Sequence, residues 1–263
     1  MTTIRDLVTQ LGSNDRATAT QSLRKLADAV DRATSPSASL EREALATALA
    51  AELVARSDAP DAKPEPTNVP GTNVKGPVFR HSVEARRYVC RFLNQVASDS
   101  QLPALAEALE DLDVRDAVRC VLECIPTPRA TAALVAALKQ VGPEFRVGVI
   151  NALAKKRWPE AMVALQGQTN DPDGEVRLAA VEGLAHFPEA ELDQPIVAAT
   201  KNGTPWQRAR AQRARLRFAE TLRLAGDKRS AITIYRSIQT HGEEPWKAAA
   251  RRAFEQLKAA ERP

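Results

Sequence analysis

The residues best suited to chemistry in this chain are arginines that crowd one stretch, PWQRARAQRARLRF at residues 205–218. A guanidinium group presents a planar fork of N–H donors that pairs with carboxylate and phosphate groups. The stretch therefore offers a surface for an anionic partner. A solvated helix face is the alternative, although like charges at this spacing repel each other. The candidate partner-binding residues are Trp206, Arg208, Arg210, Arg213, Arg215 and Arg217.

A helix must position these side chains, and the spacing of the apolar residues predicts one over 207–225. At roughly 100° per residue, the residues that gather on its apolar side are Ala211, Ala214, Phe218, Leu222 and Ala225. Arg210, Arg213 and Arg217 form a stripe on a neighbouring side, and Arg208 and Arg215 fall elsewhere. The stripe is thus separated from the face that packs.

The surroundings of the stripe also favour an acidic partner. The whole chain has a net charge of +4, but residues 201–263 hold 15 Lys+Arg against 6 Asp+Glu. Residues 79–200 carry a net negative charge. Such asymmetry is typical of a protein with an oppositely charged partner. Trp206 stands beside Pro205, where packing is the favoured role and an exposed binding anchor is the alternative.

Catalytic patterns are missing from the sequence. It has no GxSxG, no phosphate-binding Gly-rich loop and no HExxH. Its three histidines have no neighbour at ligand spacing, and its three cysteines are too few for a zinc site without help. We therefore expect no enzymatic activity, no cofactor and no metal.

The rest of the sequence predicts stacked helices. Hydrophobic residues make up 44% of the chain but aromatic residues only 4%, which suits closely packed helices rich in Ala, Leu and Val. Four arginines follow one another at intervals of 31 residues: Arg115, Arg146, Arg177 and Arg208. Each begins a helix with one apolar face, and another helix lies between each pair. This period predicts helical hairpins that bury their faces against their neighbours.

One unit carries a family resemblance. NDPDGEVRLAAVEGLA, residues 170–185, resembles the HEAT repeat, particularly the short bacterial HEAT-like form also seen in phycobilisome lyases. The resemblance covers about 79–226 and implies a right-handed alpha-solenoid of stacked helical hairpins, in which the second helices tend to line the concave surface. In that family a turn Asp and a second-helix Arg form a ladder between repeats. The corresponding structural positions are Arg115, Arg146, Asp171, Asp173 and Arg177.

Three other segments complete the predicted organisation. Residues 1–56 are predicted as a helical cap, and residues 57–78, with several prolines and glycines, as a linker or loop. LRFAETLRLAGDKRSAITIYRSI, residues 216–238, resembles a tetratricopeptide unit. We therefore expect residues 227–263 to cap the C-terminal end of the repeats.

These features lead to three functional hypotheses. The first is a non-catalytic scaffold or adaptor that binds a partner protein or peptide, acidic in character, on the concave surface. The second is nucleic-acid binding like that of HEAT-like DNA glycosylases, with the arginine stripe on phosphates, which the acidic middle of the chain disfavours. The third is an accessory subunit of the lyase type. No stretch approaches the roughly 20 apolar residues of a membrane helix. MTTIRDLVTQLGSNDR, residues 1–16, has no basic start followed by an apolar run, so we expect no signal peptide and a cytoplasmic protein.

Overall fold

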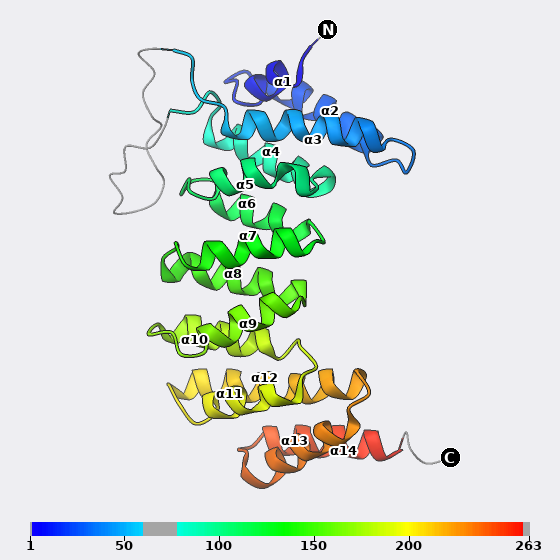
Figure 1. The fold of residues 1–263 in the computed structure, drawn as a ribbon, viewed down its shortest axis with the longest axis vertical. Helices are drawn as coiled ribbons and strands as arrows, with labels where there is room; N and C mark the ends of the chain where they lie inside the picture. Colours follow the sequence, from blue (N-terminus) through cyan, green and yellow to red (C-terminus); the bar gives the residue numbers. More distant parts are fainter. Residues whose placement is uncertain (1, 60–77, 260–263) are drawn as a thin grey trace. The chain divides into compact units, whose positions relative to one another are not determined.

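The computed structural model describes residues 2–59 and 78–259, and these are helical apart from turns and one isolated bridge. They fall into two compact units, Met1–Ala137 and Leu138–Pro263. The first contains α1 (Ile4–Leu11), α2 (Arg16–Ala33), α3 (Ser39–Val54), α4 (Val83–Val96), α5 (Leu102–Ala108), α6 (Arg115–Cys124) and most of α7 (Pro128–Leu138). The second contains α8 (Pro143–Lys156), α9 (Pro159–Gln168), α10 (Gly174–Leu184), α11 (Asp193–Ala199), α12 (Pro205–Leu224), α13 (Lys228–His241) and α14 (Trp246–Ala259) (Figure 1). The all-α prediction is confirmed.

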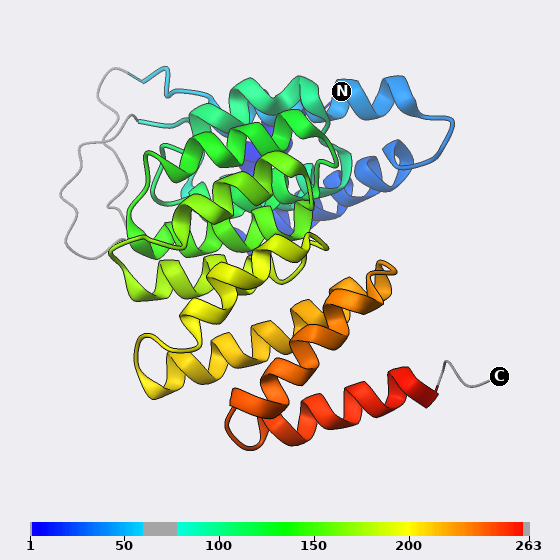
Figure 2. The same cartoon turned by 60° about the horizontal axis from the view of Figure 1, so that its bottom comes forward.

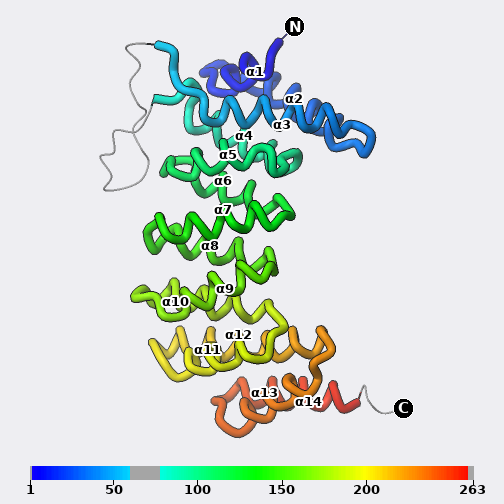
Figure 3. The backbone as a smooth tube through the Cα atoms, viewed as in Figure 1, coloured from blue at the N-terminus to red at the C-terminus, as the bar shows by residue number. Residues whose placement is uncertain are grey.

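The helices of the first unit pack as hairpins on hairpins (Figure 3). α3 packs against α4, and α5 packs against α6. Between the two hairpins, α3 lies against α5 and α4 lies against α6, so first helices stack on first helices and second helices on second helices. α1 and α2 pack on each other and on both α3 and α4. Residues 4–54 are therefore part of the same compact unit as α4 to α6.

The α3–α4 hairpin is closed at its base by backbone pairing. Arg56 and Phe79 form an antiparallel bridge, and the Ser57 N–H donates to the Val78 carbonyl at 2.9 Å. The guanidinium of Arg56 lies over the Phe79 ring, 4.5 Å from its centroid. The predicted linker at 57–78 lies almost wholly outside the described residues, but its two ends meet at this bridge.

Because the Arg56–Phe79 bridge already joins the two ends, we expect that residues 60–77 can be removed. We expect their replacement by Gly-Gly to raise the free energy of unfolding by about 1 kcal/mol, because a shorter loop loses less entropy when its ends are brought together. Urea unfolding of the parent protein and of the shortened variant, followed by circular dichroism, measures the difference in the free energy of unfolding. A loss of several kcal/mol would show that the segment stabilises the fold through contacts of its own.

The second unit repeats at the predicted interval. α8, α10 and α12 begin at Pro143, Gly174 and Pro205, each 31 residues after the last. α10 packs against α8 and α12, while α9 and α11 each pair with the helices that flank them. α12, α13 and α14 follow as further hairpins, yellow to red in Figure 2. The predicted period and the stacking of hairpins are confirmed. The predicted boundaries at 56, 78 and 226 stay predictions.

Close approach of the second helices requires a small residue. A Cβ atom at Gly183 of α10 would stand 3.2 Å from the Ala154 Cβ of α8 and 3.1 Å from a Leu165 methyl of α9. Ala154, Leu165 and Leu184 are all buried here. A larger side chain at position 183 would therefore collide with both neighbouring helices.

An arginine–aspartate pair ties adjacent hairpins of the first unit together. Arg86 on α4 donates from Nη1 to Asp111 Oδ2 at 2.5 Å and from Nε to the Leu53 carbonyl at 2.8 Å. The other oxygen of Asp111 accepts from the Asp113 N–H at 2.9 Å. Arg115, the residue expected at this place in the ladder, begins α6, and its N–H donates to the Asp111 carbonyl at 2.8 Å.

The second unit repeats this arrangement at the same sequence separation. Arg146 donates from Nη1 to Asp171 Oδ2 at 2.5 Å, and the Asp173 N–H donates to Asp171 Oδ1 at 2.8 Å. Asp173 also caps α10 through hydrogen bonds from two backbone N–H groups of its first turn. Arg177 donates to the Asp171 and Pro172 carbonyls at 2.6 and 2.8 Å. It therefore stabilises the turn before its own helix and does not reach the next hairpin.

Candidate functional site

The helix that carries the arginine stripe, α12, starts with strong local signals. Thr204 accepts from the Gln207 N–H, and the Gln207 side chain accepts from the Thr204 N–H, which is a capping box. Pro205 occupies the first turn, where its missing N–H costs nothing. Of the apolar side predicted from the sequence, Ala211, Ala214, Phe218 and Leu222 are buried. Ala225, predicted on the same side, is exposed because α12 ends at Leu224. The buried side chains fix the rotation of the helix, and with it that of its arginines.

Two of the six candidate residues are engaged in stabilising the fold. Arg215 is only 6% exposed and forms a two-pronged pair with Asp193 of α11, with both N–O distances 2.8 Å. Arg208 donates to the Gly203 carbonyl at 2.7 Å, within the turn that precedes α12. Neither guanidinium is placed to serve as a main contact for a partner.

Arg210 is held between α10 and α12. Its Nε donates to Glu182 Oε1 at 2.8 Å, its Nη2 bonds to the other Glu182 oxygen, and Glu175 lies 3.6 Å from Nη1. Hydrogen bonding to Glu182 raises the pKa of Arg210, against the effect of partial burial. The guanidinium also lies over the ring of Trp206, 4.6 Å from its centroid. Arg210 thus supports the ring while its own charge is balanced.

Three of the candidate residues remain exposed: Trp206, Arg213 and Arg217. Trp206 is 56% exposed and its ring is braced by Arg210. Arg213 makes one distant approach to Glu182, at 3.9 Å, and its side chain is 61% exposed. Within the described part of the chain, no carboxylate pairs with Arg217. We call these three residues the α12 surface.

Two carboxylates that the sequence patterns did not predict as neighbours lie beside the stripe. Glu175 and Glu182 stand 31 residues before Trp206 and Arg213, so the repeat itself places them at equivalent positions on the previous second helix. Gln207 reaches back to Glu175 as well, with an Nε2–Oε1 distance of 3.1 Å. Projection of the repeat onto adjacent helices would have revealed these neighbours. Asp193, the partner of Arg215, lies on the first helix α11, so its contact with α12 cannot be found by comparing equivalent positions on second helices.

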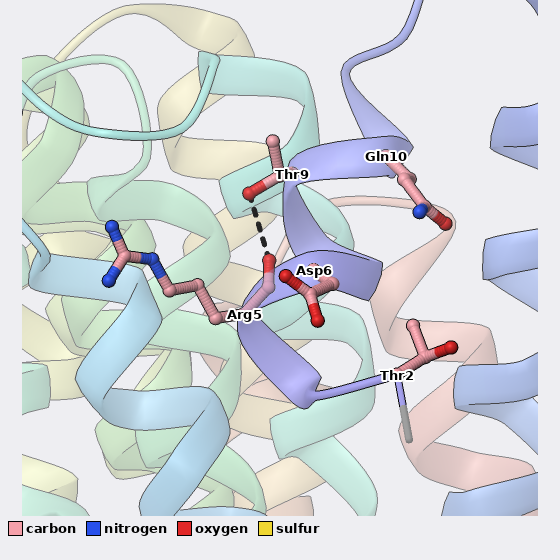
Figure 4. Close-up of a pocket in the computed structure, with 5 residues that line it drawn as sticks. All are labelled: Thr2, Arg5, Asp6, Thr9 and Gln10. Carbon is pink, nitrogen blue, oxygen red and sulfur yellow. Dashed lines mark hydrogen bonds between the residues drawn. The ribbon is translucent and has the colours of Figure 1, made fainter.

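An open depression lies over α1, at the other end of the sequence (Figure 4). It has a volume of about 470 Å³ and is lined by Thr2, Arg5, Asp6, Thr9 and Gln10, all from α1 or the residues before it. Asp6 is engaged in capping the helix, since its carboxylate accepts from the Thr3 N–H at 2.9 Å. A shallow hollow beside one short polar helix offers no convergent groups, so we do not propose it as a site.

Within residues 2–59 and 78–259, no cluster of three or more His, Cys, Asp or Glu side chains is arranged to hold a metal ion. No helix in the described residues is both long and apolar enough to span a bilayer. The buried Cys90 thiol has its pKa raised to about 12 by burial, so it is not a nucleophile at neutral pH.

The repeat unit decides the class of this protein. The chain is a helical repeat protein. Solved structures with similar chains include the complex of CpcE and CpcF of phycocyanin lyase from Nostoc sp. PCC7120, with a TM-score of 0.43 and 18% identity over 98% of this chain and 95% of that chain. A designed armadillo repeat protein in complex with the peptide (KR)4 has a TM-score of 0.32 and 16% identity over 96% and 98% of the two chains.

These likenesses carry no argument about function at such TM-scores and identities. No family model matches the sequence, and no curated protein matches it. The helical repeat is established by the chain's own 31-residue spacing and by the packing of second helix on second helix.

Proposed function

We propose that this chain is a non-catalytic protein-interaction module that binds an acidic segment of a partner protein on the α12 surface. The observation that carries the proposal is the exposure of Arg213 and Arg217, without close carboxylate partners, on the same helix as an aromatic ring that is also exposed. Tryptophan and arginine are the side chains that most often dominate the energy of an interface. Here they stand on one helix whose rotation is fixed by its buried face.

Preorganisation supports this choice. Arg210 is fixed by Glu182 and lies against the Trp206 ring, so that ring loses little freedom when a partner packs on it. The surrounding chain, residues 201–263, carries 15 Lys+Arg and 6 Asp+Glu and attracts an acidic segment at long range. From the HEAT resemblance we also propose that α12, as a second helix, lines the concave surface.

Nucleic acid fits this surface less well. Glu182 and Glu175 lie directly beside the stripe, and a phosphate backbone that follows α12 would pass close to both carboxylates. A protein segment can avoid them, because its charges need not be evenly spaced. The geometry therefore favours a protein partner.

A charge-reversal experiment tests the proposal. We expect Arg213→Glu/Arg217→Glu to weaken binding of a fluorescent Glu-rich peptide about tenfold at low salt, since tenfold corresponds to about 1.4 kcal/mol spread over two exposed charges. Fluorescence anisotropy gives the dissociation constants.

The matched control is Arg229→Glu/Arg252→Glu, which changes net charge equally at exposed positions on α13 and α14. A general effect of net charge would weaken both variants to the same extent, and that result would sink the proposed surface. Trp206→Ala supplies a second check, with an expected loss of about tenfold.

A further inference from the structure

A second group of basic side chains lies where the second helices α8, α10 and α12 end or pass one another. It consists of Arg157, directly after α8, His186, just after α10, and Arg217 on α12. The side chains of Arg157 and Arg217 are exposed, and that of His186 is half-buried. We call this group the basic cluster.

Contacts between the neighbouring helices place these three residues near one another. A Cβ atom on Gly183 of α10 would stand 3.2 Å from Ala154 of α8, and His186 and Arg157 each follow that contact by three residues. On the other side, the Thr221 hydroxyl of α12 donates to the Ala185 carbonyl at 2.8 Å. Arg217 lies one turn before Thr221, so it comes alongside the end of α10.

Electrostatics agrees with this placement. The pKa of His186 is lowered by burial first, and then by the positive charges of Arg217 and Arg157. The one nearby carboxylate on α10, Glu182, is one turn before His186 and is engaged by Arg210. The ring therefore stands in the positive field of these two guanidinium groups.

We propose that the basic cluster is a subsite for a phosphate dianion, and that it receives a phosphorylated side chain of the acidic partner segment. Two guanidinium groups and an imidazole together supply several N–H donors, and a phosphate monoester has three free oxygens to accept them, where a carboxylate has two. The phosphate subsite is independent of the proposed function, whereas the phosphorylated partner segment rests on it. Arg217 belongs to both surfaces.

One effect opposes the anion. The carboxyl ends of α8 and α10 carry partial negative charge, which favours the cations there but repels phosphate. The guanidinium groups of Arg157 and Arg217 supply the positive charge that counteracts this repulsion. We therefore expect free phosphate to bind in the millimolar range, with higher affinity when it is attached to a segment that also contacts Trp206 and Arg213.

The test follows the imidazole of His186 by NMR in the full-length protein, with inorganic phosphate as the probe and chloride at matched ionic strength as the control. We expect phosphate to raise the pKa of His186 by about one pH unit, because a nearby anion favours the protonated ring. The other two histidines, His81 and His241, are internal references. His186→Gln assigns the signal.

Two variants make the result specific. Arg157→Gln/Arg217→Gln removes the cluster's charges, and we expect it to abolish the response to phosphate. Arg229→Gln/Arg252→Gln removes the same charge elsewhere and should leave the response intact. An equal response of His186 to phosphate and chloride, or an undiminished response in Arg157→Gln/Arg217→Gln, would overturn the subsite.

A peptide pair separates this inference from the proposed function. A Glu-rich peptide with one phosphoserine should bind at least threefold more tightly than its unphosphorylated form, and Arg157→Gln alone should remove that advantage. If both peptides bind equally, through Trp206 and Arg213, the phosphorylated partner is wrong and the proposed function stands. If phosphate shifts His186 but neither peptide binds, the anion subsite stands and the proposed function is wrong.

Discussion

Asp111→Ala is expected to lower the free energy of unfolding by about 3 kcal/mol, because it leaves a buried guanidinium without its carboxylate. Arg86 is 1% exposed, and its ion pair with Asp111 has an N–O distance of 2.5 Å. Burial lowers the pKa of Arg86, and the hydrogen bond to Asp111 counteracts that effect. The remaining contacts of the guanidinium, to the Leu53 carbonyl and the Phe79 ring, carry no full negative charge.

Two comparisons show whether burial is the cause. Asp171→Ala removes the equivalent partner of Arg146, whose side chain is 23% exposed and can recruit water, so we expect a loss of about 1–2 kcal/mol. Arg86→Met combined with Asp111→Ala should recover part of the larger loss, since no buried charge is left. Urea denaturation measures all three proteins. Equal losses in the two single variants would mean that burial does not set the strength of these pairs.

Asp193→Ala is expected to cost about 2 kcal/mol of stability while leaving the affinity for a Glu-rich peptide unchanged. Its partner Arg215 is 6% exposed and bonded through two nitrogens at 2.8 Å, so the pair joins α11 to α12. The Asp193 side chain is 27% exposed, and water can replace part of the lost interaction. The cost is therefore smaller than for Asp111.

This variant separates a stabilising role of Arg215 from a binding role. Thermal or urea unfolding gives the change in stability, and anisotropy with the Glu-rich peptide gives the change in affinity. Asp193→Asn is the matched control, because it keeps an oxygen acceptor and should lose less stability than Asp193→Ala. A clear gain in peptide affinity on removal of Asp193 would show that Arg215 can turn outward and belongs to the binding surface.

Local sequence patterns determined much of this fold. The 31-residue spacing predicted the interval between α8, α10 and α12 correctly, but each helix begins three residues before its register arginine, at Pro143, Gly174 and Pro205. Prolines and capping residues set these starts, because each acts within a few residues of the helix that it begins. The inward face of α12 follows in the same way from the spacing of its apolar residues.

The repeat was less informative about ion pairs. Arg86 forms the first rung of the ladder although it is two residues beyond the position that the 31-residue register assigns to an arginine. Arg177 matches the register and yet bonds within its own turn. A long guanidinium side chain has several carbonyls and carboxylates within reach, and sequence spacing does not select among them.

The sequence by itself determined the helices, their period and the presence of an arginine-rich face, because these depend on periodicity along the chain. Only the tertiary structure decided which arginines are available. Asp193 buries Arg215, Glu182 engages Arg210, and Arg213 and Arg217 stay exposed. The physical reason is that the charge of a side chain is balanced across helices, by residues that become neighbours only when the hairpins stack.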